Sequence, residues 1–260
     1  MIDTTQMDYE RRFMGVSALY GEQSLDRFAD AEVYVIGVGG VGSWAAETLA
    51  RTAIGRMVLI DMDVLVESNI NRQLPALSET LGETKIDVMA VRIRSINPKA
   101  DVVCVDDFLT AQNVKELLPT REYVAQMQAV GKTVIVLDCV DDMSAKLAIT
   151  LHCRFNKIKC VVAGGAGAKI DPTKIRVADL KDTTQDPLLA KLRSKLREKG
   201  IAKGGKAKFD LKCVYSDEPP KVAKACQTGL NCGGFGSTVV VTATMGMVMV
   251  SEALKMISRT

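Results

Sequence analysis

A glycine-rich run, Gly-Val-Gly-Gly-Val-Gly, occupies residues 37–42 and limits which folds this chain can adopt. A short apolar, β-branched run at residues 33–36 precedes it, and residues 43–53 follow with apolar side chains in helical spacing. Glycines permit a tight turn and let the backbone approach phosphates closely, while free N–H groups and the positive dipole end of a helix N-terminus attract anions. The order of strand, glycine turn and helix therefore predicts a nucleotide-binding unit.

Strands and helices are predicted to alternate beyond this unit. Four further apolar runs predict buried strands, at residues 57–60, 102–105, 134–137 and 159–163. Three helices are predicted between them, at residues 84–96, 111–118 and 142–156. Such alternation is typical of parallel sheets with crossover helices. We therefore predict an α/β fold with a Rossmann-like, mostly parallel sheet and flanking helices. Residues 119–132 are expected to form a long loop, and the pattern loosens after residue 171.

The 260 residues are enough for one large domain with a substantial core. We predict a single adenylating domain over residues 1–260. Its parts would be an N-terminal helical arm at 1–30, a nucleotide-binding core at 31–170, and a C-terminal extension at 171–260 for substrate, tRNA and dimer contacts.

Asp61 lies 19 residues after Gly42, at the tip of the second predicted strand. A carboxylate in that place can accept hydrogen bonds from ribose hydroxyls, in NAD as well as in ATP. The next segment separates the two cofactors. Asn69 and Arg72 fall in a loop near the C-terminal ends of the strands, and Arg72 offers fork-like donors for phosphate. Lys85 opens the next helix, and as a mobile point charge it can follow a triphosphate.

Two cations that converge on the glycine turn favour a triphosphate, where charge develops during transfer. For each cation alone, a surface position is the competing interpretation. Together with the glycine run and residues 69–73, Asn-Ile-Asn-Arg-Gln, they resemble the adenylating domain of the ubiquitin-activating, MoeB and ThiF superfamily. This resemblance implies a set of ATP-binding residues: Gly37, Gly39, Gly40, Gly42, Asp61, Asp63, Asn69, Arg72 and Lys85.

The resemblance also implies catalytic roles. Asp138, in the segment 137–142, matches a fourth-strand motif whose first aspartate helps to hold Mg²⁺, so Asp138 is expected to be a metal ligand. Arg12 matches a basic N-terminal element that reaches into the ATP site of the neighbouring subunit, which implies a homodimer. Arg12, Arg72, Lys85 and Asp138 are thus the expected catalytic residues.

A closer resemblance extends over nearly the whole chain. Its motifs lie at residues 12–15, 19–21, 40–47, 60–63, 94–98, 163–167 and 234–237. They are similar to the family of tRNA threonylcarbamoyladenosine dehydratases. This implies that ATP activates the threonine carboxylate of the modified adenosine beside the anticodon. Attack from within the same side chain then closes a ring and releases AMP, after pyrophosphate has already left. ATP and Mg²⁺ are the implied cofactors, and a monovalent cation (Na⁺ or K⁺) is left open.

The chain has seven cysteines and none of them forms a Cys-x-x-Cys pair, so neither a disulfide framework nor a four-cysteine zinc site is expected. MoeB and ThiF relatives carry such paired zinc knuckles. A tethered nucleophile needs no sulfur carrier and no thioester. The alternative is an activating enzyme that adenylates the C-terminal Gly-Gly of a ubiquitin-like or sulfur-carrier protein, with Cys232 as its thiol. An NAD-dependent oxidoreductase or a non-catalytic nucleotide sensor is disfavoured, because Arg72, Lys85 and Asp138 would then have no role. A sulfur-relay protein is kept as a further partner.

Charge is unevenly spread, although the net charge is only +3. Residues 191–212 hold nine Lys or Arg against one Glu and one Asp. The spacing of Leu188, Leu189, Leu192 and Leu196 predicts an amphipathic helix with one buried face. Its basic face is expected to contact tRNA phosphates, through counterion release. A solvated helix face is the alternative.

No charged residue occurs from Ala225 to Ser251, and the continuously apolar part begins near Val239. A membrane-spanning helix needs roughly 20 apolar residues, and Thr242 and Gly246 interrupt this run. We predict a helix buried in the core or at a subunit interface, with a membrane anchor as the alternative. The polar start of the chain lacks an apolar signal region, so the expected location is the cytoplasm.

Overall fold

The computed structural model describes residues 8–21, 23–204, 207–221 and 236–258. Its α-helices are α1 (Tyr9–Tyr20), α2 (Ser24–Ala29), α3 (Gly42–Arg51), α4 (Lys85–Ile96), α5 (Val114–Leu117), α6 (Arg121–Ala129), α7 (Met143–Asn156), α8 (Pro187–Glu198) and α9 (Val239–Ser258). Its strands are β1 (Glu32–Ile36), β2 (Arg56–Ile60), β3 (Asp101–Val105), β4 (Val134–Asp138), β5 (Lys159–Ala163), β6 (Ile175–Asp179) and β7 (Lys212–Ser216).

These strands form one sheet in the order β3-β2-β1-β4-β5-β7-β6. Neighbours pair in parallel except for β6, which runs antiparallel to β7 at the edge. The predicted α/β fold with a mostly parallel sheet is confirmed. Strands β1 and β4 are adjacent and parallel, and Ile36 pairs with Asp138. The carboxyl ends of both strands therefore lie at the same edge of the sheet. We call this the carboxyl edge of the sheet.

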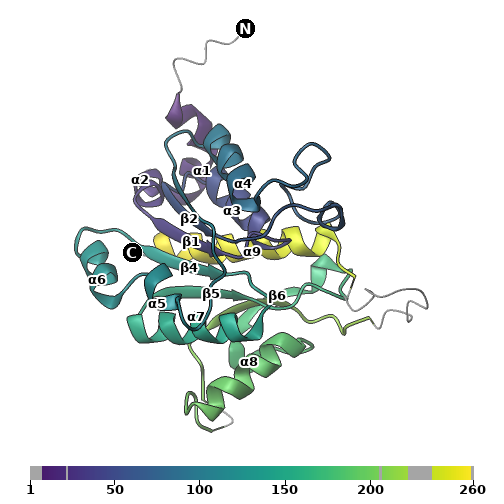
Figure 1. Ribbon diagram of the computed structural model, residues 1–260. Helices are drawn as coiled ribbons and strands as arrows, with labels where there is room; N and C mark the ends of the chain where they lie inside the picture. The colour runs from purple at the N-terminus through teal and green to yellow at the C-terminus, as the bar shows by residue number, and fades with distance from the viewer. Residues whose placement is uncertain (1–7, 22, 205–206, 222–235, 259–260) are drawn as a thin grey trace.

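Helices cover both faces of the sheet (Figure 1). Side chains of a strand alternate between faces. On β1, Val33 and Val35 therefore pack with α3, α4 and α9, while Tyr34 and Ile36 belong to the cluster that α5, α6 and α7 complete. A third cluster joins α7 and α8 to β5 and β7. Both faces of the central strands are thus buried, which explains their continuous apolar runs.

Helix α9 is a core helix, as the sequence predicted. By length and composition it is the one helix in the described ranges that could cross a membrane, yet 61% of its most apolar window is buried inside the protein. It packs against α3 at Gly246, where a Cβ atom would lie 2.5 Å from the carbonyl oxygen of Val41 and 2.9 Å from the amide of Ala45. The glycine therefore lets the two helices approach closely.

Two parts of the fold differ from expectation. The predicted loop at residues 119–132 contains α6, which begins after Thr120, whose hydroxyl accepts a hydrogen bond from the Tyr123 amide. This helix buries only Val124, so it has almost no apolar stripe to reveal it. Strands β6 and β7, in the region where the pattern loosened, were not predicted. Both join the main sheet, and the division at residues 30 and 170 stays a prediction.

Candidate nucleotide site

The glycine turn connects β1 to α3 at the carboxyl edge, and its glycines have different surroundings. Gly37 adopts φ +82°, a left-handed conformation that favours glycine. A Cβ atom on Gly42 would overlap the carbonyl oxygen of Gly37. A Cβ atom on Gly40 would lie 3.1 Å from Thr242 of α9 and 3.4 Å from Arg72. Gly37 and Gly42 are therefore required by the turn itself, whereas Gly40 leaves room for the side chains of Thr242 and Arg72.

Gly39 differs from the other three. The nearest atom to a Cβ at this position is Nε2 of Gln73, 3.9 Å away. This backbone is open on the side where a ligand can approach. Gln73 is 7% exposed, and its Oε1 is buried without a hydrogen-bond partner in the described structure. The sequence motif contained Gln73, but the set of expected site residues missed it, since nothing in the spacing shows that it lies over the turn.

Asp61 ties the turn to the following loop. Its Oδ2 accepts a hydrogen bond of 2.6 Å from the Val38 amide, and its Oδ1 accepts one of 2.9 Å from the Asp63 amide. The side chain is held at the end of β2, the position expected for a carboxylate that binds ribose.

Lys85 begins α4, as predicted, and its ammonium group is paired with carboxylates. Its Nζ donates to Oδ2 of Asp63 at 2.6 Å and lies 3.7 Å from Oδ1 of Asp61, with its side chain only 6% exposed. In the structure, these two carboxylates hold the ammonium group. Its charge is nevertheless at the carboxyl edge.

Arg72 lies beside the turn and is partly exposed. Its guanidinium donates to the Ser68 carbonyl at 2.6 Å and to Oδ1 of Asn71 at 2.9 Å. Asn69 is buried, and its Oδ1 accepts a hydrogen bond from the Val66 amide at 3.1 Å. The side chain of Asn69 thus shapes the loop that carries Arg72.

Asp138 ends β4 next to the glycine turn and is fully buried. Its Oδ1 accepts a 2.8 Å hydrogen bond from Nζ of Lys146 and a 3.2 Å bond from the Val140 amide. Burial raises the pKa of Asp138, although the Lys146 charge opposes the rise. Its Oδ2 is buried and has no partner in the described residues. Lys146 was not among the residues expected at the site, since a lysine inside a helix usually lies on the surface.

No group of three or more His, Cys, Asp or Glu in the described ranges could hold a metal ion. Mg²⁺, however, is usually bound by one or two carboxylates together with substrate phosphates. The free Oδ2 of Asp138 fits that kind of ligand set.

Arg12 lies far from this site within its own chain. Its guanidinium donates to the Ile96 carbonyl at 3.0 Å, at the end of α4 opposite to Lys85. The helix between them is about 17 Å long. Cys232 and residues 234–235 of the last motif lie outside the described residues.

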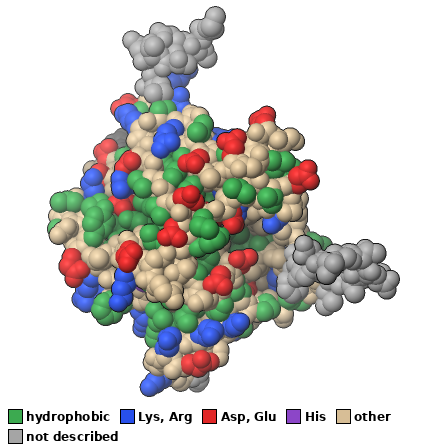
Figure 2. All heavy atoms as spheres, in the orientation of Figure 1, with side chains coloured by type: hydrophobic (Ala, Val, Ile, Leu, Met, Phe, Trp, Pro, Cys, Tyr) green, Lys and Arg blue, Asp and Glu red, His purple; other side chains and the backbone are tan. Residues whose placement is uncertain are grey.

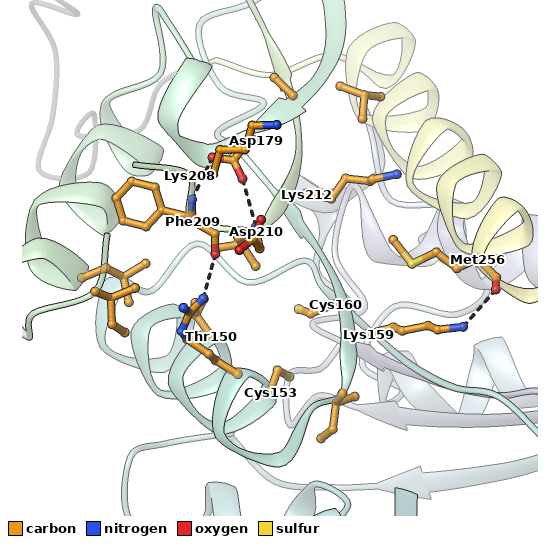
Figure 3. A pocket seen from close by; sticks show the side chains of 17 residues that line it. Thr150, Cys153, Lys159, Cys160, Asp179, Lys208, Phe209, Asp210, Lys212 and Met256 are labelled. Carbon is orange, nitrogen blue, oxygen red and sulfur yellow. Dashed lines mark hydrogen bonds between the residues drawn. The ribbon is translucent and has the colours of Figure 1, made fainter. Parts of the chain in front are cut away.

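A cavity of about 910 Å³ lies elsewhere (Figure 3). Its lining includes Lys159 and Lys212, which begin β5 and β7, and Asp179, which ends the antiparallel β6. All three mark the edge of the sheet opposite to the glycine turn, about 15 Å away along the strands. This cavity is not the nucleotide site.

A parallel sheet with a glycine turn at its carboxyl edge, an acidic residue on the next strand and nearby cations defines a Rossmann-like nucleotide-binding protein. The model of the ThiF family matches residues 9–260, and the chain belongs to that family.

Named relatives are similar along almost their whole length. The chain is 47% identical to the tRNA threonylcarbamoyladenosine dehydratase of Escherichia coli K12, over 95% of this chain and 93% of the relative. It is 42% identical to the enzyme of the same name from Haemophilus influenzae, with the same coverage. The crystal structure of the E. coli dehydratase TcdA in complex with ATP superposes with a TM-score of 0.81, at 47% identity, covering 96% of this chain and 94% of that one.

Proposed function

We propose that this chain is an ATP-dependent tRNA threonylcarbamoyladenosine dehydratase. The observation that carries the proposal is the 47% identity over 95% of the chain, because it includes both the nucleotide site and the parts beyond residue 170. The cations Arg72 and Lys85 at the carboxyl edge support ATP as the nucleotide, as does the ATP complex of the 47% identical E. coli dehydratase.

In the proposed reaction, a carboxylate oxygen of the modified adenosine attacks the α-phosphorus of ATP and pyrophosphate leaves. A nucleophile of the same side chain then attacks the activated carbonyl carbon, and AMP leaves as the ring closes. No protein nucleophile is needed, since the attacking group is already tethered. The protein contributes binding, orientation and stabilisation of charge around the α-phosphate.

Different residues of the site provide the binding, the orientation and the stabilisation of charge. The backbone at Gly39 approaches the phosphates, and Asp61 accepts hydrogen bonds from the ribose. Arg72 and Lys85 supply positive charge at the phosphates, with Asp63 holding Lys85 and Asn69 shaping the loop that carries Arg72.

Asp138 would hold Mg²⁺ through its unpartnered Oδ2. The ion would neutralise phosphate charge in the site. A monovalent cation, Na⁺ or K⁺, stays a prediction without assigned ligands.

A homodimer is part of the proposal. Arg12 does not reach the glycine turn of its own chain, so its expected catalytic role requires a neighbouring subunit. Apolar side chains that a partner would cover are exposed on α1, α4 and α9: Met14, Leu19, Val91, Val240 and Met247.

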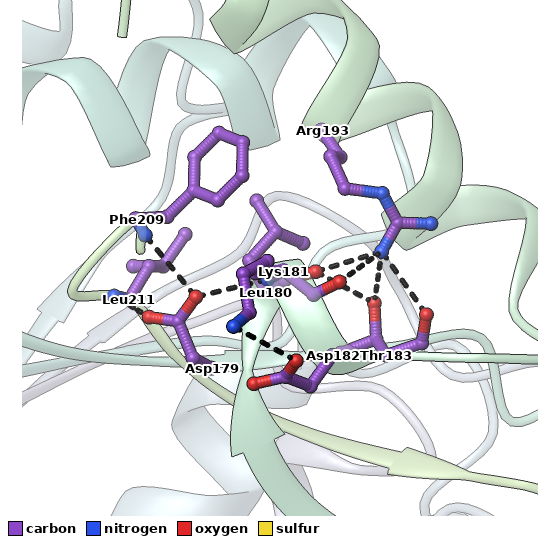
Figure 4. A network of polar contacts seen from close by, with 8 residues as sticks. All are labelled: Asp179, Leu180, Lys181, Asp182, Thr183, Arg193, Phe209 and Leu211. Atoms are coloured by element: carbon purple, nitrogen blue, oxygen red, sulfur yellow. Dashed lines mark hydrogen bonds and ion pairs between the residues drawn. The ribbon is translucent and has the colours of Figure 1, made fainter. Parts of the chain in front are cut away.

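Helix α8 is proposed to contact tRNA. Of the four leucines predicted to form its buried face, Leu189, Leu192 and Leu196 are buried and Leu188 is half-buried. Figure 2 shows Lys and Arg side chains over the α8 region at the bottom of the view. Arg193 is not one of the free cations. Its guanidinium donates to the carbonyls of Leu180 and Thr183 at 2.7 and 3.0 Å, which fixes the turn after β6 (Figure 4). Lys191 and Lys199 are among the exposed lysines that can contact phosphates.

The second candidate, an activating enzyme for a carrier protein, has weaker support. The chain is 30% identical to the ThiS adenylyltransferase of E. coli, over 64% of this chain. A sulfur-relay partner and a cytoplasmic location are kept as parts of the proposal.

The test is mass spectrometry of nucleosides from threonylcarbamoyl-modified tRNA after incubation with the protein, ATP and Mg²⁺. We expect the modified adenosine to lose one water only when ATP is present, with AMP and pyrophosphate formed in equal amounts. An unchanged nucleoside, together with ATP–pyrophosphate exchange that depends on a Gly-Gly-tailed carrier, would favour the second candidate.

A further inference from the structure

Lys146 has no place in the proposed reaction, yet it forms the most deeply buried ion pair at the site. It closes the first turn of α7, and both it and Asp138 have fully buried side chains. Its Nζ lies 2.8 Å from Oδ1 of Asp138. Asp142 caps the N-terminus of α7 by accepting a hydrogen bond from the Ala145 amide at 2.8 Å, so the turn that carries Lys146 is itself fixed.

Such a pair is an expensive way to fill a core. The free energy needed to remove two charges from water is often larger than the free energy gained from their attraction. A protein with well-packed apolar side chains of similar volume in their place can be equally stable or more stable. A buried pair that persists beside a nucleotide site is therefore a candidate for function.

The two oxygens of Asp138 are unequal. Oδ1 accepts from both Lys146 and the Val140 amide, whereas Oδ2 is buried and unpartnered. Two donors on one oxygen fix the rotation of the carboxylate. The position of Oδ2 is then fixed as well, at the carboxyl end of β4, where the next two residues, Cys139 and Val140, lie against Gly37 of the glycine turn.

We propose that Lys146 is a positioning residue, which holds the carboxylate of Asp138 so that Oδ2 is the oxygen offered to the magnesium–phosphate group of ATP. The inference rests on the proposed function only for the use of magnesium and ATP. Partners that orient a metal ligand typically contribute about 10- to 100-fold to metal affinity or activity.

The experiment measures ATP affinity by titration calorimetry with Mg²⁺ and with EDTA, in the wild type, Lys146→Met, Asp138→Asn and the double variant. We expect Mg²⁺ to tighten ATP binding in the wild type. In each single variant, the affinity for ATP in the presence of Mg²⁺ is expected to fall about 10- to 100-fold. The affinity for ATP in EDTA should change little. The double variant should be no worse than either single one, because both changes remove the same arrangement.

Lys159→Met is the matched control. Lys159 is half-buried at the opposite edge of the sheet, and its Nζ donates to the Met256 carbonyl at 3.0 Å (Figure 3). This change should lower the melting temperature but leave the effect of Mg²⁺ intact. Lys146→Arg, which keeps the charge and the donors, should restore part of the Mg²⁺ effect.

A Lys146→Met protein that melts lower but keeps the full gain from Mg²⁺ would overturn the inference and leave Lys146 as a structural residue. A wild type whose ATP binding gains nothing from Mg²⁺ would overturn it too. Failure of the proposed function looks different: the tRNA nucleoside would stay unchanged while the calorimetric pattern was still present.

Discussion

Gly39 and Gly42 belong to one turn but have opposite environments. Gly42 has no room for a side chain because the Gly37 carbonyl oxygen occupies that space, whereas Gly39 faces an open side. A glycine motif therefore combines two requirements, one for folding and one for ligand approach, and substitutions separate them.

We predict that Gly39→Ala folds with a melting temperature close to that of the wild type but binds ATP at least tenfold more weakly, because its methyl group occupies the open side of the turn. Gly42→Ala is expected to lower the melting temperature clearly, even without nucleotide. Thermal unfolding with and without ATP measures both effects. Tight ATP binding by Gly39→Ala would show that the phosphates do not approach this backbone.

Among secondary-structure elements, α8 and the chain up to β7 show that a count of basic residues overstates the surface available to RNA. Arg193 holds the turn after β6 through backbone carbonyls, Lys212 pairs with Glu252, and Arg197 lies over the ring of Phe209. The exposed lysines on the outer side of the helix remain.

We predict that Lys191→Gln and Lys199→Gln each weaken tRNA binding and reduce the slope of log affinity against log salt by up to about 0.9 per lost phosphate contact. The KM for ATP should not change. Lys115→Gln, an exposed lysine of α5, is the control. Filter-binding titrations at several salt concentrations give the tRNA affinity and its salt slope. Equal slopes in all three variants would exclude α8 from the tRNA interface.

The sequence predicted those elements whose pattern is strong. The β1–turn–α3 unit, the apolar central strands and the buried face of α8 were recognisable, because periodicity and glycine spacing report burial directly. Helix α6 was not, since its single buried residue leaves no stripe. Of the site, the glycines, Asp61 and Asp138 could be placed from strand ends. The partners Lys146 and Gln73 could not, because contacts between separate elements leave no local signal.

For the whole molecule, the position of Arg12 is the main reason to expect a dimer. Its side chain is bound to the end of α4 that lies away from the nucleotide site. If Arg12 acts in catalysis, one subunit must complete the site of the other, and inactive subunits should complement each other.

We predict that Arg12→Ala and Asp138→Asn are each nearly inactive, and that an equal mixture, after subunit exchange, regains about a quarter of wild-type activity. Half of the dimers would be mixed, and each mixed dimer would contain one intact site. Asparagine is chosen because alanine would leave Lys146 buried without a partner. A mixture that stays inactive, with mixed dimers verified by native mass spectrometry, would exclude a role across subunits.

The placement of α9 also bears on how the protein is made. Thr242 and Gly246 of this helix touch Gly40, Val41 and Ala45, some 200 residues earlier in the chain. Synthesis proceeds from the N-terminus at about 5–20 residues per second, and earlier parts generally fold first. The glycine turn therefore leaves the ribosome well before its support does. Nascent chains should be unable to retain ATP until α9 has emerged, so the onset of nucleotide binding marks a late step of biosynthesis.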